Sequence, residues 1–261
     1  MALIQMTFAS DALKMNMEAT VLLPENAGSM IGMESRAGGK CPVLYLLHGM
    51  TDDHTIWERR TSIERYVSAL NLAVVMPEGH LGWYTDMQVG PRYFTYISDE
   101  LPRLCQSLFP QISARREDTF VAGLSMGGYG ALKCGLKRPD VFSHAAGLSS
   151  AADIQNGFAN KDPWRRQMWI DLFGDAKTAA AQGNDLFTLA SQPANSASAR
   201  FFMWCGTDDG LYDANVRLRD RLLATGYDLS WSQGPGGHSW EKWDEQIQNV
   251  LAWLPLGGKE V

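Results

Sequence analysis

The segment Thr119–Gly130 constrains the fold of this chain more than any other. It begins with the apolar run Thr119–Ala122, continues through GLSMG at Gly123–Gly127, and then opens a stretch with helical periodicity. A strand that turns so sharply into a helix holds the residue at its apex, Ser125, in a strained conformation with its hydroxyl above the sheet. The pattern therefore predicts a nucleophilic serine. The alternative is a glycine-rich turn whose serine only caps the helix.

Other apolar runs fit the same architecture. Val43–Leu47 contains no charged residue, as is typical of a strand buried on both faces. Helix-period segments separate such runs, which favours an α/β fold with a mostly parallel central sheet and helices on both faces. With 261 residues we expect a single domain over 1–261. The expected strands are Ala19–Leu23, Pro42–Leu47, Leu72–Met76, Thr119–Ala122, His144–Leu148, Arg200–Cys205 and Asp228–Ser232.

Charge and composition exclude several classes of protein. The formal net charge of −6 offers no attraction to nucleic acid or to an anionic membrane surface. Met1–Ser10 lacks the pattern of a secretory signal, which favours a cytoplasmic location, and no run approaches the roughly 18 apolar residues of a membrane span. The four cysteines form no Cys-x-x-Cys pair, so we expect no metal or redox site. Gly28–Gly39 is interpreted as a surface loop.

The segment Ser149–Ala199 departs from this alternation. It holds Trp164, Trp169 and Phe173 among polar and alanine-rich stretches. An irregular insertion after the strand that follows the nucleophile often covers the site of a one-domain hydrolase as a cap. Ordinary surface helices explain the composition equally well, so both interpretations stay open.

A base for Ser125 can be chosen by chain order. In this type of fold the serine is followed first by an acid and then by a histidine. Of the five histidines, only His238 lies after both Ser125 and an acid at a strand end. It falls in a glycine-rich loop, Gly234–Trp240, between the last strand and the last helix. The sequence therefore predicts His238 as the general base, against the alternative of an ordinary surface histidine.

The acid is less clearly defined. Phe201–Cys205 is an apolar strand, and both Asp208 and Asp209 leave its carboxyl end. Adjacent side chains point in different directions, so one can accept from His238 while the other caps the turn or faces solvent. The spacing to His238 does not decide between the two aspartates.

The oxyanion hole is expected to use two backbone N–H groups. One belongs to Met126, directly after the nucleophile, and the other to the loop after Val43–Leu47. We assign the second donor to Met50, with Gly49 as the alternative. His48 is interpreted as a structural residue that shapes this turn, and Glu78 is also interpreted as structural.

Four aromatic residues and one glycine are candidates for the substrate pocket. Trp57, Trp83, Tyr84 and Trp240 lie near the loops expected to surround the site, and Gly49 lies within one of them. Core or loop packing is the competing interpretation for the aromatic residues.

Five sequence blocks together resemble the esterase D branch of the α/β-hydrolases, which includes the S-formylglutathione hydrolases. The similarity is closest to the tributyrin esterases of Gram-positive bacteria, and it extends from about residue 20 to 255. The blocks are Val43–Met50 (VLYLLHGM), Gly82–Asp86 (GWYTD), Gly123–Gly130 (GLSMGGYG), Trp204–Tyr212 (WCGTDDGLY) and Gly237–Trp243 (GHSWEKW).

The resemblance implies a serine carboxylesterase that hydrolyses short-chain acyl esters, acetyl to butyryl, without a cofactor. Its partner is then a small-molecule ester, and members of the family often form homo-oligomers. The family serine falls on Ser125 and the histidine on His238. The family acid lies third after the glycine that ends the strand, here Gly206, and this selects Asp209.

Several related activities remain as alternatives. The branch also contains S-formylglutathione hydrolases, carbohydrate acetyl and feruloyl esterases, and mycolyltransferases. The formylglutathione enzymes carry a Ser-Gly-Leu-Thr-Cys type of turn where this chain has His48–Asp52 (HGMTD), which disfavours that activity. An acyltransferase of the same fold and a non-catalytic binding protein on a hydrolase scaffold are the other two alternatives.

Overall fold

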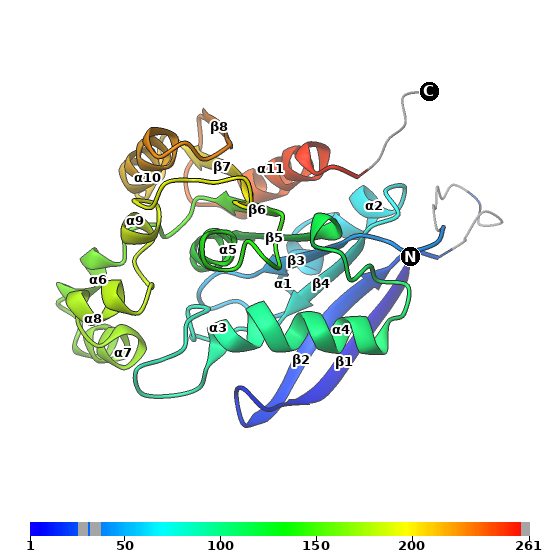
Figure 1. Cartoon of the computed structure of the whole chain (residues 1–261), viewed down its shortest axis with the longest axis horizontal. Helices are drawn as coiled ribbons and strands as arrows, with labels where there is room; N and C mark the ends of the chain where they lie inside the picture. Colours follow the sequence, from blue (N-terminus) through cyan, green and yellow to red (C-terminus); the bar gives the residue numbers. More distant parts are fainter. Residues whose placement is uncertain (26–30, 32–37, 257–261) are drawn as a thin grey trace.

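One eight-stranded sheet organises the described residues 1–25, 31 and 38–256 of the computed structural model (Figure 1). Most of the predicted Gly28–Gly39 loop lies outside the described residues. The strand order is β1-β2-β4-β3-β5-β6-β7-β8. The strands are β1 (Ala2–Ser10), β2 (Met15–Leu23), β3 (Val43–Leu47), β4 (Ala73–Pro77), β5 (Thr119–Leu124), β6 (His144–Leu148), β7 (Arg200–Gly206) and β8 (Leu229–Gly234).

The sheet is mostly parallel, as predicted. β3 to β8 run parallel to one another, whereas β2 is antiparallel to both β1 and β4. β1 was not expected from the sequence. Its residues alternate between half-buried and exposed along most of the strand, as in an edge strand with one solvated face, so it lacks a continuous apolar run.

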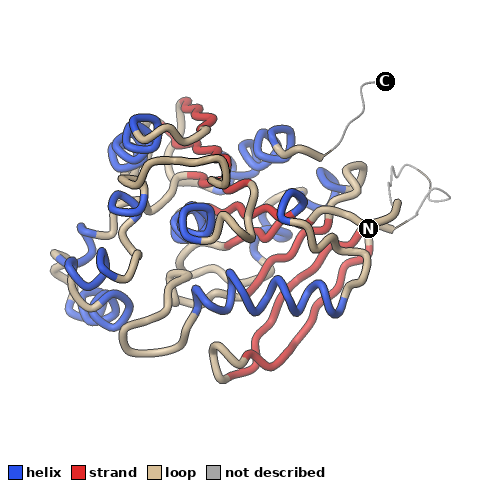
Figure 2. Tube along the Cα trace, in the orientation of Figure 1, coloured by secondary structure: helices blue, strands red, loops and turns tan. Residues whose placement is uncertain are grey.

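The sheet divides the core into two layers, and Figure 2 shows helices on both of its faces. Successive residues of β3 alternate between the layers: Tyr45 faces one and Leu44 the other. The first layer is covered by α3 (Tyr93–Thr95), the π-helical turn η1 (Tyr96–Glu100), α4 (Leu101–Leu108), α5 (Met126–Lys137) and α10 (Tyr212–Ala224), and the second by α1 (Ile56–Arg60), α2 (Ile63–Val67) and α11 (Trp240–Trp253).

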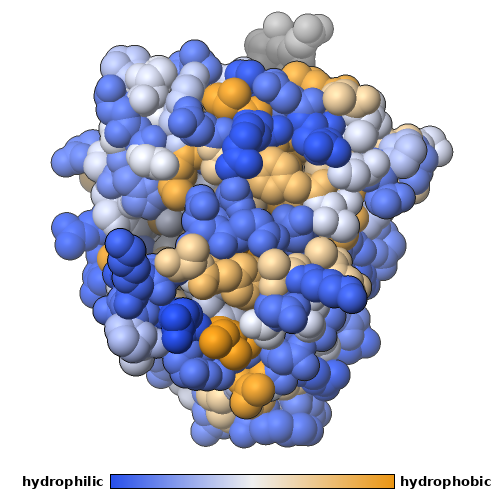
Figure 3. Space-filling view, turned by 90° about the vertical axis from the view of Figure 1, so that its left-hand side faces the viewer, coloured by the Kyte–Doolittle hydropathy of each residue, from blue (hydrophilic) through white to orange (hydrophobic). Residues whose placement is uncertain are grey.

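The segment 149–199 folds into four short helices at one end of the molecule, on the left in Figure 1. Asp162 caps the longest of them by accepting from Arg165 N–H at 2.9 Å. Figure 3 faces this end and shows apolar patches among hydrophilic side chains. The helices are α6 (Gln155–Phe158), α7 (Pro163–Phe173), α8 (Ala176–Ala181) and α9 (Leu186–Leu189).

The parallel register brings several loops to one edge of the sheet. Leu47 at the end of β3 pairs with Gly123 of β5, and Gly206 at the end of β7 pairs with Gly234 of β8. Ligands of open α/β sheets bind at this carboxyl edge. No helix in the described part of the chain has the length and apolar character needed to cross a bilayer.

Candidate active site

Ser125 lies at the apex of the turn between β5 and α5, in the strained conformation that its sequence predicts. Its φ of 51° and ψ of −115° are unusual for a residue with a side chain. Its N–H donates to Leu148 O at 2.9 Å. A Cβ on Gly123 would collide with the Gly127 backbone, and a Cβ on Gly127 would collide with the carbonyl oxygens of Leu47 and His48. Only glycines therefore allow this turn to approach β3.

His238 and Asp209 form a hydrogen-bonded pair at the same edge of the sheet. His238 Nδ1 lies 2.8 Å from Asp209 Oδ2; the histidine side chain is 37% exposed and the aspartate side chain 1% exposed. Burial raises the pKa of Asp209, but the hydrogen bonds from His238 and from Leu211 N–H outweigh it, so the net shift is downward. The carboxylate therefore stays ionised and can orient the ring.

Asp208 has a different contact. Its Oδ2 accepts from Gly236 N–H at 3.0 Å, and its own N–H donates to Gly236 O at 3.1 Å. Asp208 thus anchors the backbone of residues 235–239, which we call the His238 loop, whereas Asp209 contacts the ring itself. The two adjacent aspartates divide these tasks because their side chains leave the turn in different directions.

Ser125 Oγ and the His238 ring are not hydrogen-bonded to each other in this structure. The ring nitrogen opposite Asp209, Nε2, has no hydrogen-bond partner among the described residues. Hydrogen bonds of this kind are often long before a substrate binds.

The loop of residues 48–53, which we call the His48 loop, packs directly against the serine. A Cβ on Gly49 would lie 2.7 Å from Leu124 Cδ1, 2.9 Å from Asp52 Oδ2 and 3.8 Å from Ser125 Cβ. No backbone acceptor in the described part of the chain takes the N–H of Met50 or Met126. The assignment of Met50 and Met126 as oxyanion donors is compatible with these contacts and stays a prediction.

His48 is almost completely buried and holds the shape of this loop. Its Nδ1 lies 2.7 Å from Gly49 O, and its Nε2 accepts from Gly79 N–H at 2.9 Å. Glu78 Oε1 lies 3.3 Å from the same Nε2 and also accepts from His80 N–H at 2.7 Å. Burial raises the pKa of Glu78, but these neighbours outweigh it and lower the pKa to about 2. Glu78 was expected to be structural, and its contacts give it the role of fixing His48.

Tyr84 connects the His48 loop to the helix behind the serine. Its hydroxyl donates to His48 O at 2.9 Å, and its carbonyl accepts from Lys133 Nζ of α5 at 3.3 Å. Its ring fills the space that a Cβ on Gly79 or Gly130 would occupy. Lys133 is completely buried, which lowers the pKa of its amine well below the usual value. No pattern in the sequence marks this contact, because Tyr84 and His48 lie on different loops.

The aromatic residues expected to line a pocket pack against neighbouring elements. Trp57 is 1% exposed and donates from Nε1 to Leu47 O at 3.0 Å, and Trp83 is buried against Trp169. Trp240 packs edge-on against Trp57. These tryptophans and Gly49 are not among the residues that line the cavity described next, and their place in a substrate pocket stays a prediction.

A cavity of about 760 Å³ opens beside the His48 loop. Its lining includes Thr51–Asp53, Glu78 and Tyr93, together with residues of α7. From α7 come Trp164, Gln167, Met168 and Asp171. Their spacing of three and four residues places them on one face of the helix. Among the described residues, no group of three or more His, Cys, Asp or Glu side chains could hold a metal ion.

Fold and site together define an α/β-hydrolase with a serine-centred site. A strained serine lies between a parallel strand and its helix, and a histidine–carboxylate pair lies on the neighbouring strand ends. The Esterase family model matches residues 10–254, so the chain belongs to the Esterase family.

Individual relatives agree with this assignment. The chain is 31% identical to an acetyl esterase of Caldicellulosiruptor saccharolyticus, with 97% of this chain and 98% of the relative covered. It is 30% identical to FphF, a fluorophosphonate-binding serine hydrolase of Staphylococcus aureus, with a TM-score of 0.84 and 98% of each chain covered. It is also 30% identical to the S-formylglutathione hydrolase FrmB of that organism, with a TM-score of 0.82 and coverage of 98% and 99%. The chain is a serine carboxylesterase of the esterase D type.

Proposed function

We propose that this protein hydrolyses short-chain acyl esters, acetyl to butyryl, with Ser125 as nucleophile, His238 as general base and Asp209 as the acid that orients it. The observation that carries the proposal is the 2.8 Å contact between His238 and the buried Asp209, on the edge of the sheet where Ser125 is strained. The similarity to an acetyl esterase supports the short acyl chain.

The reaction proceeds by two acyl transfers. His238 Nε2 takes the proton of Ser125 Oγ as the oxygen attacks the ester carbonyl, and the resulting oxyanion accepts from the N–H groups of Met50 and Met126. When the carbon–oxygen bond of the ester breaks, the alcohol leaves with the proton from His238. Water then attacks the acyl-enzyme by the same route, releases the carboxylic acid and restores Ser125.

The test compares turnover of p-nitrophenyl acetate and butyrate by the wild type, Ser125→Ala and Ser191→Ala. Ser191 is an exposed serine after α9 and serves as the matched control. We expect a loss of roughly 10⁶-fold in kcat for Ser125→Ala and no change for the control. Equal rates for Ser125→Ala and the wild type would overturn the assignment of the nucleophile.

Transfer of the acyl group to a second alcohol is the alternative activity. One relative, 27% identical over 82% of this chain, is a diacylglycerol acyltransferase/mycolyltransferase of Mycobacterium leprae. Product analysis with a low concentration of added acceptor alcohol separates the two activities. A dominant ester product would favour transfer, and a dominant free acid would favour hydrolysis.

A further inference from the structure

We propose that the cavity between the His48 loop and α7 binds the alcohol half of the ester, and that this alcohol carries a positive charge. The inference rests on the proposed esterase function. It adds the chemical class of the leaving group, which neither the Ser125 site nor its contacts define.

The position of the cavity connects it to the reacting atoms. Its wall includes Thr51 and Asp52, the two residues that follow the proposed oxyanion donor Met50. Asp52 Oδ2 and Ser125 Cβ both lie within 4 Å of the point that a Cβ on Gly49 would occupy. Asp52, which lines the cavity, is therefore close to the serine, so this side of the cavity adjoins the reacting atoms.

The size of the cavity assigns it to the alcohol half. A volume of about 760 Å³ lies within the range of roughly 300–1,000 Å³ that holds drug-sized ligands. An acyl group of two to four carbons fills only a small part of such a volume. The larger group of the ester is then its alcohol.

The negatively charged side chains that line the cavity favour the binding of a cation. Asp52, Asp53, Glu78 and Asp171 line the cavity, and no lysine or arginine does so among the described residues. No basic group in the described part of the chain forms an ion pair with Asp52, Asp53 or Asp171, although burial raises the pKa of Asp52 and the charge of Arg59 acts on Asp52 and Asp53. The pKa of Glu78 is lowered to about 2, so this residue stays charged. These carboxylates would repel an anionic leaving group such as glutathione.

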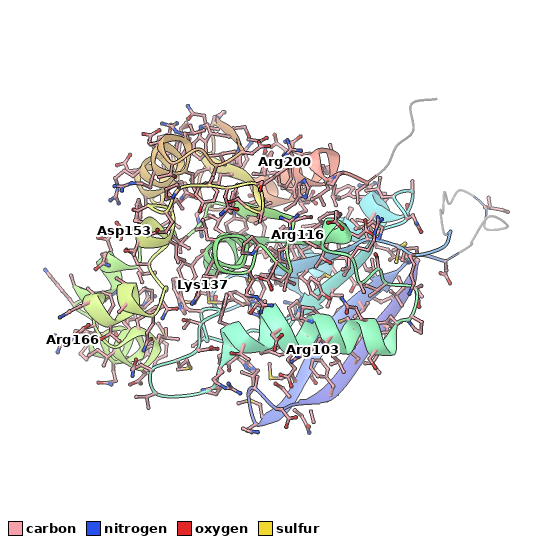
Figure 4. All side chains as sticks on the ribbon, viewed as in Figure 1. Arg103, Arg116, Lys137, Asp153, Arg166 and Arg200 are labelled. Atoms are coloured by element: carbon pink, nitrogen blue, oxygen red, sulfur yellow. The ribbon has the colours of Figure 1, made fainter. Side chains whose placement is uncertain are left out.

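An aromatic surface on α7 completes the site. Trp164 is 61% exposed although it lines the cavity, and it shares one face of the helix with Asp171. An exposed indole and a carboxylate on the same helix face, two turns apart, offer an ammonium group both an aromatic surface and a negative charge. Arg166 of α7 lies at the outer edge of the molecule in Figure 4 and is not among the residues that line the cavity.

The test uses two esters of the same shape. Acetylcholine and 3,3-dimethylbutyl acetate differ only in that a quaternary nitrogen of the first is a carbon in the second. We expect kcat/KM to be at least tenfold higher for acetylcholine, because a cation beside an aromatic ring and a carboxylate gains about 1.4 kcal/mol or more, and this gain to shrink at high salt.

Three variants locate the source of that preference. Trp164→Ala and Asp171→Asn change side chains at the surface of α7, and each should reduce the ratio of kcat/KM values by threefold or more. Asp220→Asn, which removes one exposed carboxylate from α10, is the matched control and should leave the ratio unchanged.

Two results would overturn the inference: a ratio near one in the wild type, or a ratio that neither α7 variant changes. In both cases p-nitrophenyl acetate would still be hydrolysed in a Ser125-dependent manner, so the esterase proposal would stand. A different result would contradict the esterase proposal itself: Ser125→Ala would hydrolyse p-nitrophenyl acetate as fast as the wild type.

Discussion

The His48 loop and the His238 loop each bring a histidine to the carboxyl edge of the sheet, but the two histidines are held very differently. The His48 side chain is 1% exposed and has contacts on both ring nitrogens. The His238 side chain is 37% exposed, and only its Nδ1 has a partner among the described residues, the carboxylate of Asp209.

This difference separates a histidine that shapes a loop from one that can move a proton. A ring with both nitrogens engaged has no free position for a substrate proton, whereas Nε2 of His238 has no partner among the described residues, as the proposed role of general base requires. A rigid His48 loop suits the proposed role of Met50 as an oxyanion donor, because such donors work only when they are aligned before the reaction. The following predictions test this division of roles, from the largest expected effect to the smallest.

The first prediction separates the two aspartates around the His238 loop. Asp209→Asn should reduce kcat by roughly 10,000-fold, because an amide favours the wrong tautomer of His238 and does not stabilise the imidazolium. Asp208→Asn keeps an oxygen for Gly236 N–H and should change kcat by less than about fivefold. Steady-state kinetics with p-nitrophenyl acetate measures both. A crippled Asp208→Asn beside an active Asp209→Asn would reverse the assignment.

The second prediction concerns the contact between the His48 loop and the serine. Gly49→Ala places a methyl group 2.7 Å from Leu124 Cδ1 and 2.9 Å from Asp52 Oδ2, so these two side chains or the loop itself must shift. We expect kcat to fall roughly 100-fold, the effect typical of losing one oxyanion donor, with a small change in thermal stability. Gly210→Ala is the control, because its added Cβ meets no atom within 4 Å. Equal activity of the two variants would contradict a rigid, aligned His48 loop.

The same comparison explains how much the sequence predicts. Ser125, His238 and the parallel strands follow from local patterns, because strand, turn and helix are contiguous and chain order leaves one histidine. The residues left no physical basis for choosing Asp209 over Asp208. The choice came from resemblance; in the structure Asp209 contacts the His238 ring, whereas Asp208 contacts Gly236 N–H.

Long-range contacts account for what the sequence does not predict. Glu78 and Tyr84 fix the His48 loop from 30 or more positions away, and such pairings depend on how the loops meet in space. Strand β1 was not predicted, because the residues of this edge strand alternate between half-buried and exposed positions and form no continuous apolar run. The cavity wall on α7 combines a helix face with two distant loops, so no single segment reveals it.

The third prediction tests whether Tyr84 acts on the His48 loop. Tyr84→Phe removes the donor to His48 O and leaves that buried carbonyl without this hydrogen bond. The loss costs about 1.4 kcal/mol and should appear as a roughly tenfold lower kcat at nearly unchanged KM. Tyr212→Phe removes an exposed hydroxyl bonded to Gln233 and is the matched control. A higher KM with unchanged kcat would place Tyr84 in substrate binding instead.

The smallest expected effect is on stability, and it distinguishes the electrostatics of the two loops. The pKa of Glu78 is lowered to about 2 in the folded protein from an ordinary value of 4.5. Its contribution to stability is therefore complete above pH 4.5 and is lost as the pH falls toward 2. Between pH 7 and pH 4 this loss amounts to about 1 kcal/mol.

Urea unfolding of the wild type, Glu78→Gln and Asp209→Asn at pH 7 and pH 4 measures this loss. The pKa of Asp209 is also lowered, so both variants should be less sensitive to acid than the wild type. Glu78→Gln should lose the larger share of that sensitivity, because its carboxylate has contacts to the His48 ring and to the N–H groups of His54 and His80. If Asp209→Asn lost the larger share of the acid sensitivity, the His238 loop would be held more strongly than the His48 loop. The proposed division between a rigid loop of oxyanion donors and a histidine free to act as base would then fail.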